Sequence, residues 1–365
     1  MRLSRITLEN FRNIPLAEVT LVGRQQFFIG QNGQGKTNLL EAVGYLTALR
    51  SFRTSDQRLL ISHGKDGAGI AYEIEHELLD DTGVTIKLRP DGKEITCDGE
   101  WVTKFAEFLG RFPTVVFSSQ DQQLVRGAPA FRRRWLDLTI AAMDTGYLSL
   151  LQQYHRAVLD RNRLLKNGAS PLEFSAFELP LATTSAQIVQ KRLANVKVLS
   201  GFVAEAYASI AGAKERIIMR YKPDIEQTDV TAWTKTYALN RVRDLQMKAT
   251  SAGPHRDDFD LVFEGRLSVR DYGSEGQQRS LALALRLAQV NYFHERSGVQ
   301  PVVLADDVLG ELDPERRSKF WKAIGFDCQV IATGTHLPDA DLGEWQIFKV
   351  DGGKFIEMDR REFSQ

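Results

Sequence analysis

The sequence predicts an α/β fold in which a core built from both ends of the chain is interrupted by a helical insertion domain. Three observations support this: strand patterns fill the first 125 residues, helical periodicity fills the middle, and strands alternate with helices near the end. We therefore assign residues 1–125 and 250–365 to one discontinuous core and residues 126–249 to the insertion. A chain of 365 residues is long enough for two or three such units.

Strand patterns in the first part of the chain surround one Gly-rich turn. The apolar run Phe27–Ile29 predicts a strand, and a helix is expected through Leu39–Leu49 after the turn. From about Gly69 to Val102 the pattern is a β-meander, because Asp91-Gly92 between two alternating runs is a strong hairpin signal. Thr114–Phe117 predicts a short, fully apolar strand.

The middle of the chain has helical periodicity. Apolar residues recur at helical spacing from Tyr147 to Leu165, and Gly168 supplies a C-terminal stop. A second helix is expected over Leu181–Ile210, so the two make a helical hairpin. Strand and helix patterns alternate after Ser251. The expected elements there are strand Phe259–Phe263, helix Glu275–His294, and strands Val302–Ala305, Gln329–Thr333 and Gln346–Val350.

The composition excludes several classes of protein. The chain has 47 Lys+Arg, 47 Asp+Glu and 43% hydrophobic residues, which excludes a disordered or fibrous chain. Its two cysteines, Cys97 and Cys328, lie far apart, which excludes a cysteine zinc site and fits a reducing compartment. No apolar run is long enough to span a membrane, and the first residues lack the apolar stretch of a signal peptide. We expect a cytoplasmic protein with no membrane partner.

A phosphate-binding loop (P-loop) is predicted between the strand Phe27–Ile29 and the helix that follows. The residues matching GxxxxGK[ST] are Gly30, Gln31, Asn32, Gly33, Gln34, Gly35, Lys36 and Thr37. Such glycines let backbone N–H groups surround phosphates at a helix N-terminus. Lys36 is expected to reach the β- and γ-phosphates, and the Thr37 hydroxyl to bind Mg²⁺. ATP and Mg²⁺ are therefore the expected cofactors, and a chance Gly-rich turn is the alternative.

Two carboxylates end the apolar run that begins at Pro301. A P-loop needs a carboxylate at the end of a neighbouring buried strand to hold the magnesium ion, and Asp306 fits that position. Asp307 is the candidate catalytic residue that orients or deprotonates the attacking water. The alternative for Asp307 is a supporting partner with no role as a base.

A third element, Ser274-Glu275-Gly276-Gln277-Gln278, lies at the start of a helix upstream of Asp306. A serine there can be a plain helix cap. The order of the motifs resembles ATP-binding-cassette (ABC) proteins, whose signature serine and helix N-terminus contact the γ-phosphate held by a second subunit. The resemblance implies that Ser274 is catalytic and that Ser274, Gly276 and Gln277 bind nucleotide, although Glu275 replaces a signature glycine.

Three shorter segments resemble other ABC motifs. Leu309–Asp313 is similar to the D-loop, which contacts the partner subunit. His336 follows a strand as the switch histidine does, and a solvated loop histidine is the alternative. Gln120 occupies a position similar to the Q-loop, where it would bind the metal.

The chain resembles, nearly from end to end, the RecF family of recombination mediators, which are relatives of Rad50 and the SMC proteins. The segments that carry this resemblance are Leu8–Asn13, Asn32–Ala42, Ser51–Thr54, Leu124–Pro129, Arg132–Asp137, Gly253–Asp258 and Ser274–Arg279. The pair Asp306-Asp307 is also similar to that family, where transporters have Asp-Glu. One departure is Ser119-Gln120-Asp121, where Pro-Glu-Asp is expected.

The resemblance implies an ABC-type ATPase head, a β-meander lobe included, that binds DNA in an ATP-dependent way. It implies head-to-head homodimers on ATP, binding to double-stranded DNA and single-strand gap junctions, and action with RecO and RecR in loading RecA. ATP hydrolysis would be weak, DNA-stimulated and a switch for release. Arg12 would lie near the nucleotide, and Arg53 on a loop near phosphate or DNA.

Basic residues are concentrated at the start of the insertion. Between Arg126 and Lys166 there are eight basic residues and three acidic ones. Arg132, Arg133 and Arg134 repel one another unless something anionic meets them, so we expect them to contact the DNA backbone. A solvated face is one alternative, and attachment of the insertion to an acidic face of the core is another.

The sequence leaves two questions open. The segment His255–Asp258 is either functional or part of a buried network that links the insertion to the core. The function has three alternatives: a transporter ATPase subunit, which would need a shorter insertion that docks a membrane partner; a P-loop kinase, in which the signature segment would have no purpose; and an SMC- or Rad50-like structural head. The structural head needs hundreds of heptad residues, whereas about 120 residues separate Phe131 from Ser251.

Overall fold

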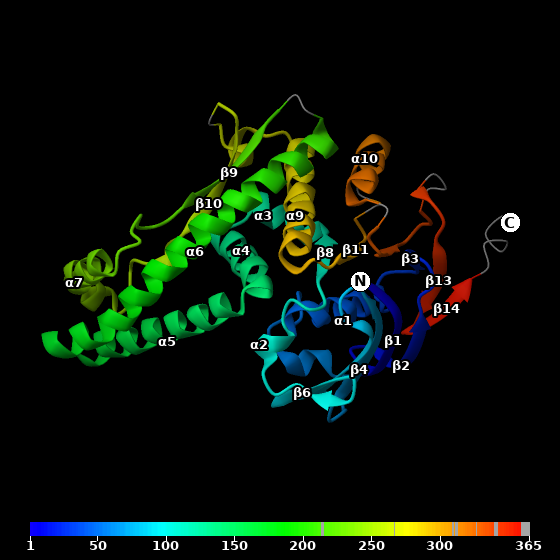
Figure 1. Cartoon of the computed structure of the whole chain (residues 1–365), viewed down its shortest axis with the longest axis horizontal. Helices are drawn as coiled ribbons and strands as arrows, with labels where there is room; N and C mark the ends of the chain where they lie inside the picture. The colour runs from blue at the N-terminus through cyan, green and yellow to red at the C-terminus, as the bar shows by residue number, and fades with distance from the viewer. Residues whose placement is uncertain are drawn as a thin grey trace. The chain divides into compact units, whose positions relative to one another are not determined.

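The computed structural model describes residues 1–212, 215–265, 267–308, 310, 313–325, 327–338 and 342–358. The chain divides into two compact units, coloured along the sequence in Figure 1. The first unit comprises Met1–Asp121, Ser209–Gly212 and Leu283–Gln365. The second unit comprises Gln122–Ala208 and Ala213–Ala282.

An antiparallel six-stranded sheet forms one layer of the first unit, with strand order β2-β1-β4-β5-β6-β7. Alternate residues are buried along β4, as the period of two predicts for a sheet with one covered face. Arg89 pairs with Gly92, so the predicted hairpin is present. The strands are β1 Arg2–Phe11, β2 Ile14–Thr20, β4 Ala68–His76, β5 Asp80–Arg89, β6 Gly92–Cys97 and β7 Glu100–Trp101.

The second sheet of this unit has the order β14-β13-β3-β12-β11-β8 and is parallel except for β14. Its central strand β12 is buried throughout, as expected for a parallel strand covered on both faces. Because β3, β11 and β12 are parallel neighbours, their carboxyl ends lie at one edge. The strands are β3 Gln25–Ile29, β8 Thr114–Ser118, β11 Val302–Asp306, β12 Val330–Gly334, β13 Gln346–Asp351 and β14 Lys354–Met358.

Helix α1 (Lys36–Ala48) contacts strands of both sheets, namely β1, β8, β11 and β12. Its buried residues, among them Leu39, Leu40 and Val43, belong to one apolar core together with strand residues such as Leu8 and Phe28. The start of α1 is therefore fixed beside the carboxyl edge of the parallel sheet. The other helices that lie wholly in this unit are α2 Phe105–Phe108 and α10 Pro314–Ile324.

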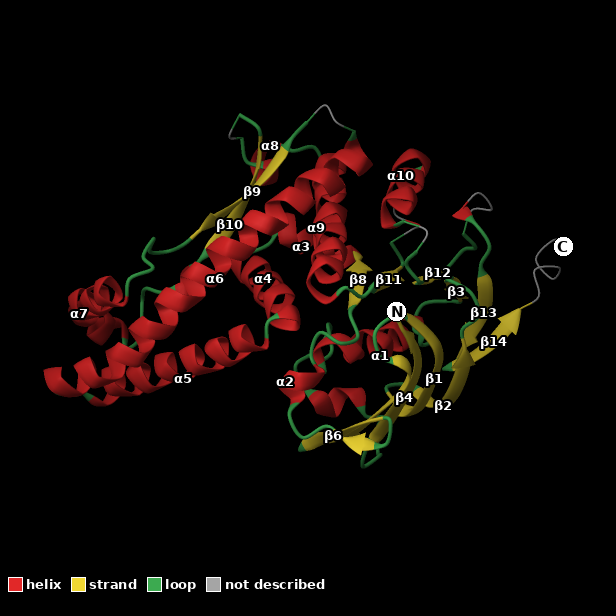
Figure 2. Cartoon of the chain, viewed as in Figure 1, coloured by secondary structure: helices red, strands yellow, loops and turns green. Residues whose placement is uncertain are grey.

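The second unit is mainly helical (Figure 2). Helices α5 and α6 form the predicted hairpin, and the Arg161 guanidinium on α5 contacts the Glu178 carboxylate on α6 at 3.1 Å. Strands β9 and β10 pair antiparallel. The elements are α3 Gln122–Arg126, α4 Pro129–Met143, α5 Thr145–Asn167, α6 Pro171–Ala211, β9 Ile217–Lys222, α7 Val230–Met247, β10 Asp258–Phe263, α8 Val269–Tyr272 and α9 Glu275–Ser297. The last residues of α6, from Ser209, and those of α9, from Leu283, belong to the first unit.

Helix α6 begins ten residues before the predicted start at Leu181. Pro180 lies inside this helix, where a proline removes one helical hydrogen bond. The helix continues through Pro180 because Phe174, Glu178 and Leu181 are buried on one face of the same helix. Tertiary packing of that face outweighs the local cost of the proline.

The chain returns to the first unit at Leu283, later than the predicted return at residue 250. The reason is the sheet in the second unit: β10 pairs along its whole length with β9, a strand that the sequence pattern did not reveal. Residues 250–282 are therefore held among the helices of the insertion.

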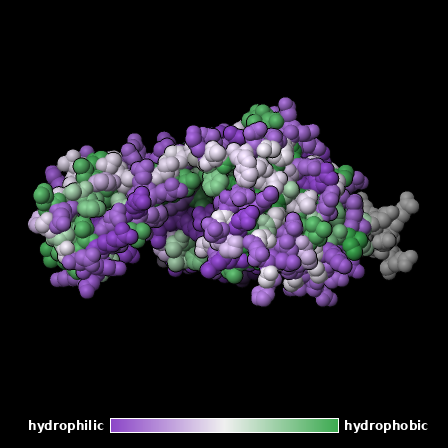
Figure 3. Space-filling model, turned by 90° about the horizontal axis from the view of Figure 1, so that it is seen from below, coloured by the Kyte–Doolittle hydropathy of each residue, from purple (hydrophilic) through white to green (hydrophobic). Residues whose placement is uncertain are grey.

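Hydrophilic residues predominate on the face of the molecule shown in Figure 3, and hydrophobic residues form separate small patches there. Within the described ranges, no helix has the length and apolarity needed to cross a membrane. Cys97 and Cys328 are both free thiols.

Candidate functional site

The P-loop has the backbone conformation that its glycines allow. Gly33 and Gly35 have φ values of 82° and 115°, a region that side chains disfavour. A Cβ atom at Gly30 would lie 2.4 Å from the Val350 carbonyl oxygen. The loop is braced by the turn between β13 and β14, because the Gly353 N–H donates to the Gln34 carbonyl at 2.8 Å.

Lys36 lies at the first position of α1 with its side chain turned back over the loop. Its ammonium donates to the carbonyl of Gly30 and, at 3.0 Å, to that of Gln31. Lys36 is 6% exposed, and this burial lowers the pKa of its ammonium, while the charges of Asp307 and Asp306 oppose the shift. The positive charge is therefore held over the loop, where phosphates would lie.

The predicted metal ligands are in contact. The Thr37 hydroxyl donates to Asp306 Oδ1 at 2.8 Å, and the Thr333 hydroxyl donates to the same oxygen at 3.0 Å. Hydroxyl and carboxylate oxygens are the ligands Mg²⁺ prefers, and Mg²⁺ is usually held by few protein ligands together with phosphates and water. Thr37 and Asp306 thus fit a magnesium ion. Thr333, at the end of β12, completes the arrangement, and the sequence pattern gave it no role beyond ending a strand.

Asp307 has a strained backbone at the end of β11. Its φ is 57°, and its N–H donates to Thr333 Oγ1 at 3.2 Å. Burial raises the pKa of its carboxyl group, and the repulsion from Asp306 adds to this, whereas Lys36 and His336 lower it. A carboxyl group with a raised pKa is compatible with a base, and this role of Asp307 stays a prediction. His336 is exposed, and Asp307 and His336 line one pocket.

A pocket of about 230 Å³ joins these groups at the carboxyl edge of the parallel sheet. Its lining includes the loop, both carboxylates and one arginine that lies outside the P-loop. The residues are Asn32, Gly33, Gly35, Lys36, Thr37, Asn38, Arg53, Asp306, Asp307 and Thr333. Of the residues predicted from the sequence, Lys36, Thr37, Asp306 and Asp307 are therefore brought together in one place, whereas Gln120 is not among the lining residues.

A buried carboxylate that sequence reasoning missed holds the two arginines beside this pocket. Glu41, 0% exposed in α1, accepts two hydrogen bonds from the Arg12 guanidinium, at 2.7 and 2.9 Å. Arg53 Nη1 donates to Glu41 at 3.2 Å and to Asn38 Oδ1 at 2.7 Å. Arg53 thus lies in the nucleotide pocket, whereas Arg12 points to Glu41 and does not line the pocket. The signal that could have revealed Glu41 from the sequence is an acidic residue among the apolar residues of a helix.

The Q-loop position is occupied differently from the prediction. Gln120 is exposed in the 3₁₀ turn Ser119–Asp121 and does not line the pocket. Asp121 is the buried residue of this turn: it accepts from the Ser118 N–H at 2.8 Å and from Arg286 at 2.6 Å. In this structure the turn is therefore anchored by Asp121, and a metal contact by Gln120 stays a prediction.

The signature segment starts α9 as a capping box. The Ser274 hydroxyl accepts from the Gln277 N–H at 3.3 Å, and Gln277 Oε1 accepts from the Ser274 N–H at 2.7 Å. Ser274 is exposed and Gly276 is partly exposed. Ser274 therefore caps α9 and is also exposed to solvent. Most of the D-loop candidate, at residues 309, 311 and 312, lies outside the described residues.

The arginine triplet is divided between the interior and the surface of the second unit. Arg132, 5% exposed, donates to both oxygens of Asp258 at 2.7 and 2.8 Å. Arg133 donates to the Asp257 carbonyl at 2.7 Å, and Arg134 is exposed. The alternative interpretation, in which arginines of the triplet hold the fold together, thus describes Arg132 and Arg133. The segment His255–Asp258 is therefore partly structural, because Asp257 and Asp258 accept these hydrogen bonds.

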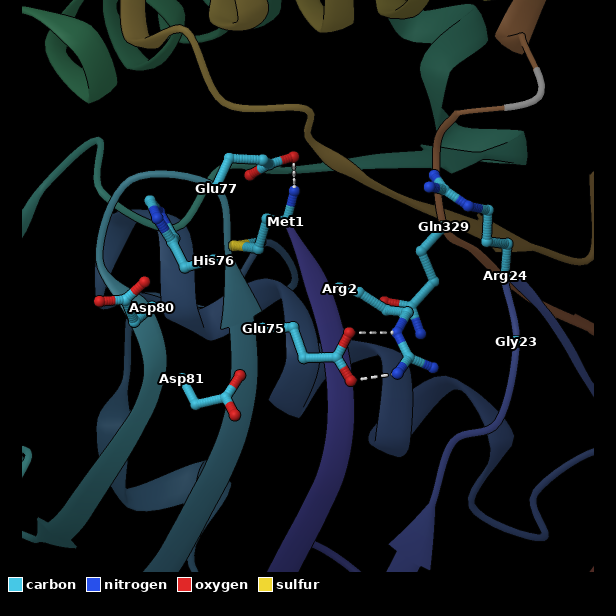
Figure 4. Close-up of a pocket in the computed structure, with 10 residues that line it drawn as sticks. All are labelled: Met1, Arg2, Gly23, Arg24, Glu75, His76, Glu77, Asp80, Asp81 and Gln329. Atoms are coloured by element: carbon cyan, nitrogen blue, oxygen red, sulfur yellow. Dashed lines mark hydrogen bonds and ion pairs between the residues drawn. The ribbon is translucent and has the colours of Figure 1, made fainter.

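A larger pocket, of about 820 Å³, lies elsewhere in the first unit (Figure 4). Four carboxylates, Glu75, Glu77, Asp80 and Asp81, line it, and Glu75 pairs with Arg2. It contains none of the P-loop residues. Size alone therefore does not mark the functional site of this chain.

Comparison with known proteins identifies relatives over nearly the whole chain. Residues 2–336 match the family model described as the RecF/RecN/SMC N terminal domain. The "DNA replication and repair protein RecF" of Synechococcus sp. (strain JA-2-3B'a(2-13)) is 36% identical, with 98% of each chain covered. The protein of the same description from Lactobacillus johnsonii is 33% identical, with 96% of each chain covered.

Solved structures agree with the fold. The structure described as "the recombination mediator protein RecF-ATP in RecFOR pathway" has a TM-score of 0.89 and 28% identity, covering 98% of this chain and 97% of that one. An SMC head bound to the C-winged helix domain of ScpA has a TM-score of 0.57 at 14% identity, covering 99% of each chain, and shows the fold alone. The predicted ABC-type ATPase head is confirmed.

Proposed function

Because this chain belongs to the RecF family, we propose that it is an ATP-dependent DNA-binding protein of recombinational repair. One observation carries the proposal: Lys36, Thr37, Asp306 and Asp307 line a single pocket under a P-loop. Relatives of this chain are described as DNA replication and repair proteins, and a solved relative is described with ATP. The chain would act in the cytoplasm, where its free thiols stay reduced.

ATP would bind with its phosphates on the loop from Gly30 to Thr37. The Lys36 ammonium would leave the Gly30 and Gln31 carbonyls for phosphate oxygens, an exchange that needs only a side-chain movement. Thr37 and Asp306 would hold Mg²⁺, which neutralises phosphate charge when bound. Asp307 would orient the attacking water or take its proton. Gln120 is a further candidate for the metal, after a movement of its turn.

ATP would also drive formation of a homodimer. Ser274, Gly276 and Gln277 lie in the second unit, and the P-loop lies in the first. In the proposed dimer, the exposed N-terminus of α9 from one subunit meets the γ-phosphate on the P-loop of the other, where its dipole favours negative charge. Ser274 would contribute its hydroxyl there and would exchange its cap contact with Gln277.

The test is the variant Ser274→Arg. We expect it to bind ATP like the wild type, because Ser274 is not part of the P-loop pocket. The ATP-induced dimer should be lost, since a bulky side chain would stand at the phosphate. Size-exclusion chromatography with light scattering, with and without ATP, measures this. A variant that still dimerises on ATP would contradict the two-subunit site.

The finer parts of the proposal concern DNA and partners. The chain would bind double-stranded DNA and single-strand gap junctions and act with RecO and RecR, since a relative is described in the RecFOR pathway. Hydrolysis would be weak and would serve release. Of the four arginines predicted to contact DNA, Arg134 is the exposed one without a partner among the described side chains, and Arg53 lines the nucleotide pocket. The proposed nucleic-acid contact therefore starts from Arg134.

A further inference from the structure

We infer that Arg134 and Arg256 form a phosphate-binding site for a nucleic-acid backbone, held in place by a buried arginine–aspartate network beneath them. The inference rests on the proposed DNA-binding function and deepens it. It assigns a role to Arg256, which lies in the His255–Asp258 segment that the nucleotide site leaves unexplained. Both arginines belong to the second unit.

The network under this site is a set of closely matched charges. Arg192, 2% exposed on α6, donates to Asp257 at 2.6 Å and to both oxygens of Asp137 at 2.9 Å. Arg132 holds Asp258 with two hydrogen bonds. Asp257 is 1% exposed and also accepts from the Asp224 N–H at 2.9 Å. Every carboxylate of the network thus has an arginine partner.

The two exposed arginines lie outside this set of ion pairs. The network contains three carboxylates: Asp137 and Asp257 are bonded to Arg192, and Asp258 is bonded to Arg132, while Arg133 donates to the Asp257 backbone carbonyl. Arg134 and Arg256 are exposed, and across the described ranges no hydrogen bond or ion pair engages either guanidinium. The three carboxylates of the network are thus already paired, and two surface guanidiniums without a partner among the described residues favour an anion from outside.

The network also holds the two arginines near each other. Arg133 and Asp257, which are next to Arg134 and Arg256 in the sequence, are bonded to each other. Arg133 Nη1 donates to the Asp257 carbonyl at 2.7 Å. Helix α4, which carries Arg134, packs on β10, and the Trp135 and Phe259 rings contact each other with centroids 5.6 Å apart. Arg256 lies two residues before β10 in a short 3₁₀ turn. Packing and hydrogen bonds therefore fix the backbone segments that carry Arg134 and Arg256.

Phosphate of a nucleic-acid backbone is the anion this arrangement suits. The paired N–H groups of a guanidinium match the spacing of phosphate oxygens, and adjacent phosphates of a strand can each bind one guanidinium. Contacts of this kind depend on salt and are independent of sequence. The site would therefore position a duplex without selecting its sequence.

The experiment uses the full chain loaded with ATP and a DNA duplex of fixed length, titrated at several salt concentrations. Removal of one phosphate contact should reduce the slope of log K against log salt by about 0.9. We expect Arg134→Ala and Arg256→Ala each to reduce it by about one unit, and the double variant by about two. The double lysine variant keeps both charges and should restore most of the slope.

Arg163→Ala is the matched control, because Arg163 is an exposed arginine of the same unit that already pairs with Asp160 at 3.0 Å. Its salt slope should equal that of the wild type. An unchanged slope in the double alanine variant would overturn the inference, whether or not that variant still forms the ATP-induced dimer. A wild-type chain that binds no duplex would instead refute the proposed function.

Discussion

The nucleotide pocket and the arginine network are both built around charged side chains, yet they treat charge in opposite ways. In the pocket, Lys36, Asp306 and Asp307 surround open space and are joined mainly to backbone carbonyls and hydroxyls. In the network, Arg192 and Arg132 are bonded directly to carboxylates in the protein interior. The first arrangement leaves charge available for a ligand, and the second consumes it within the fold.

This difference shows why a run of basic residues is a poor guide to binding. Arg132, Arg133 and Arg134 are consecutive on one helix, so their side chains point about 100° apart. One turn of α4 therefore places a buried arginine, a partly buried one and an exposed one in sequence. Only the partner groups, which come from residues 257 and 258, decide which of the three remain available.

The largest effect should come from breaking the network at Arg192. Arg192→Leu leaves the Asp137 and Asp257 carboxylates without their guanidinium, which typically costs about 3–5 kcal/mol for a buried pair. Urea unfolding followed by circular dichroism measures the free energy of unfolding. Arg163→Ala, which removes an exposed ion pair, should cost no more than about 1 kcal/mol. Equal stabilities of the two variants would show that the network is dispensable.

The contrast also separates what the sequence could predict from what it could not. The strand before the P-loop was predicted correctly, and the predicted P-loop residues lie beside Asp306, because a local pattern of glycines and apolar residues itself builds that backbone. Glu41 was missed, since its role depends on Arg12 and Arg53 arriving from other parts of the chain. The pairing of Arg132 with Asp258 joins residues 126 positions apart, and no local pattern reports it.

A smaller effect is expected at Arg53, which would sharpen the boundary between the two kinds of site. Arg53 lines the nucleotide pocket, so Arg53→Ala should weaken ATP binding by about tenfold, the value of one charge-assisted hydrogen bond. Its duplex salt slope should stay unchanged. Isothermal titration with ATP and duplex titration at several salt concentrations test both parts. A reduced salt slope with unchanged ATP affinity would show that Arg53 contacts DNA and not ATP, in line with the DNA contact predicted from the sequence.

The smallest effect concerns His255, which lies at the edge of the network. His255 Nδ1 lies 2.5 Å from the Tyr154 hydroxyl, and Nε2 lies 3.1 Å from the Thr250 carbonyl, an arrangement that fits a neutral ring with its proton on Nε2. Burial lowers the pKa of His255, and the positive charges of Arg256 and Arg133 add to this, while the Thr250 carbonyl and Asp224 oppose it.

Stability should therefore fall in mild acid. Because the folded-state pKa of His255 lies below its unfolded value of about 6.5, the unfolded chain takes up the proton first as the pH drops, and the folded state loses stability below that value. The loss cannot exceed about 1.4 kcal/mol per pH unit for one group. Urea unfolding of His255→Gln between about pH 7.5 and 5.5, a range that brackets the unfolded value, should show a weaker pH dependence than the wild type. The exposed neighbour variant His155→Gln should keep the wild-type dependence, and the same flattening in both variants would remove His255 from this role.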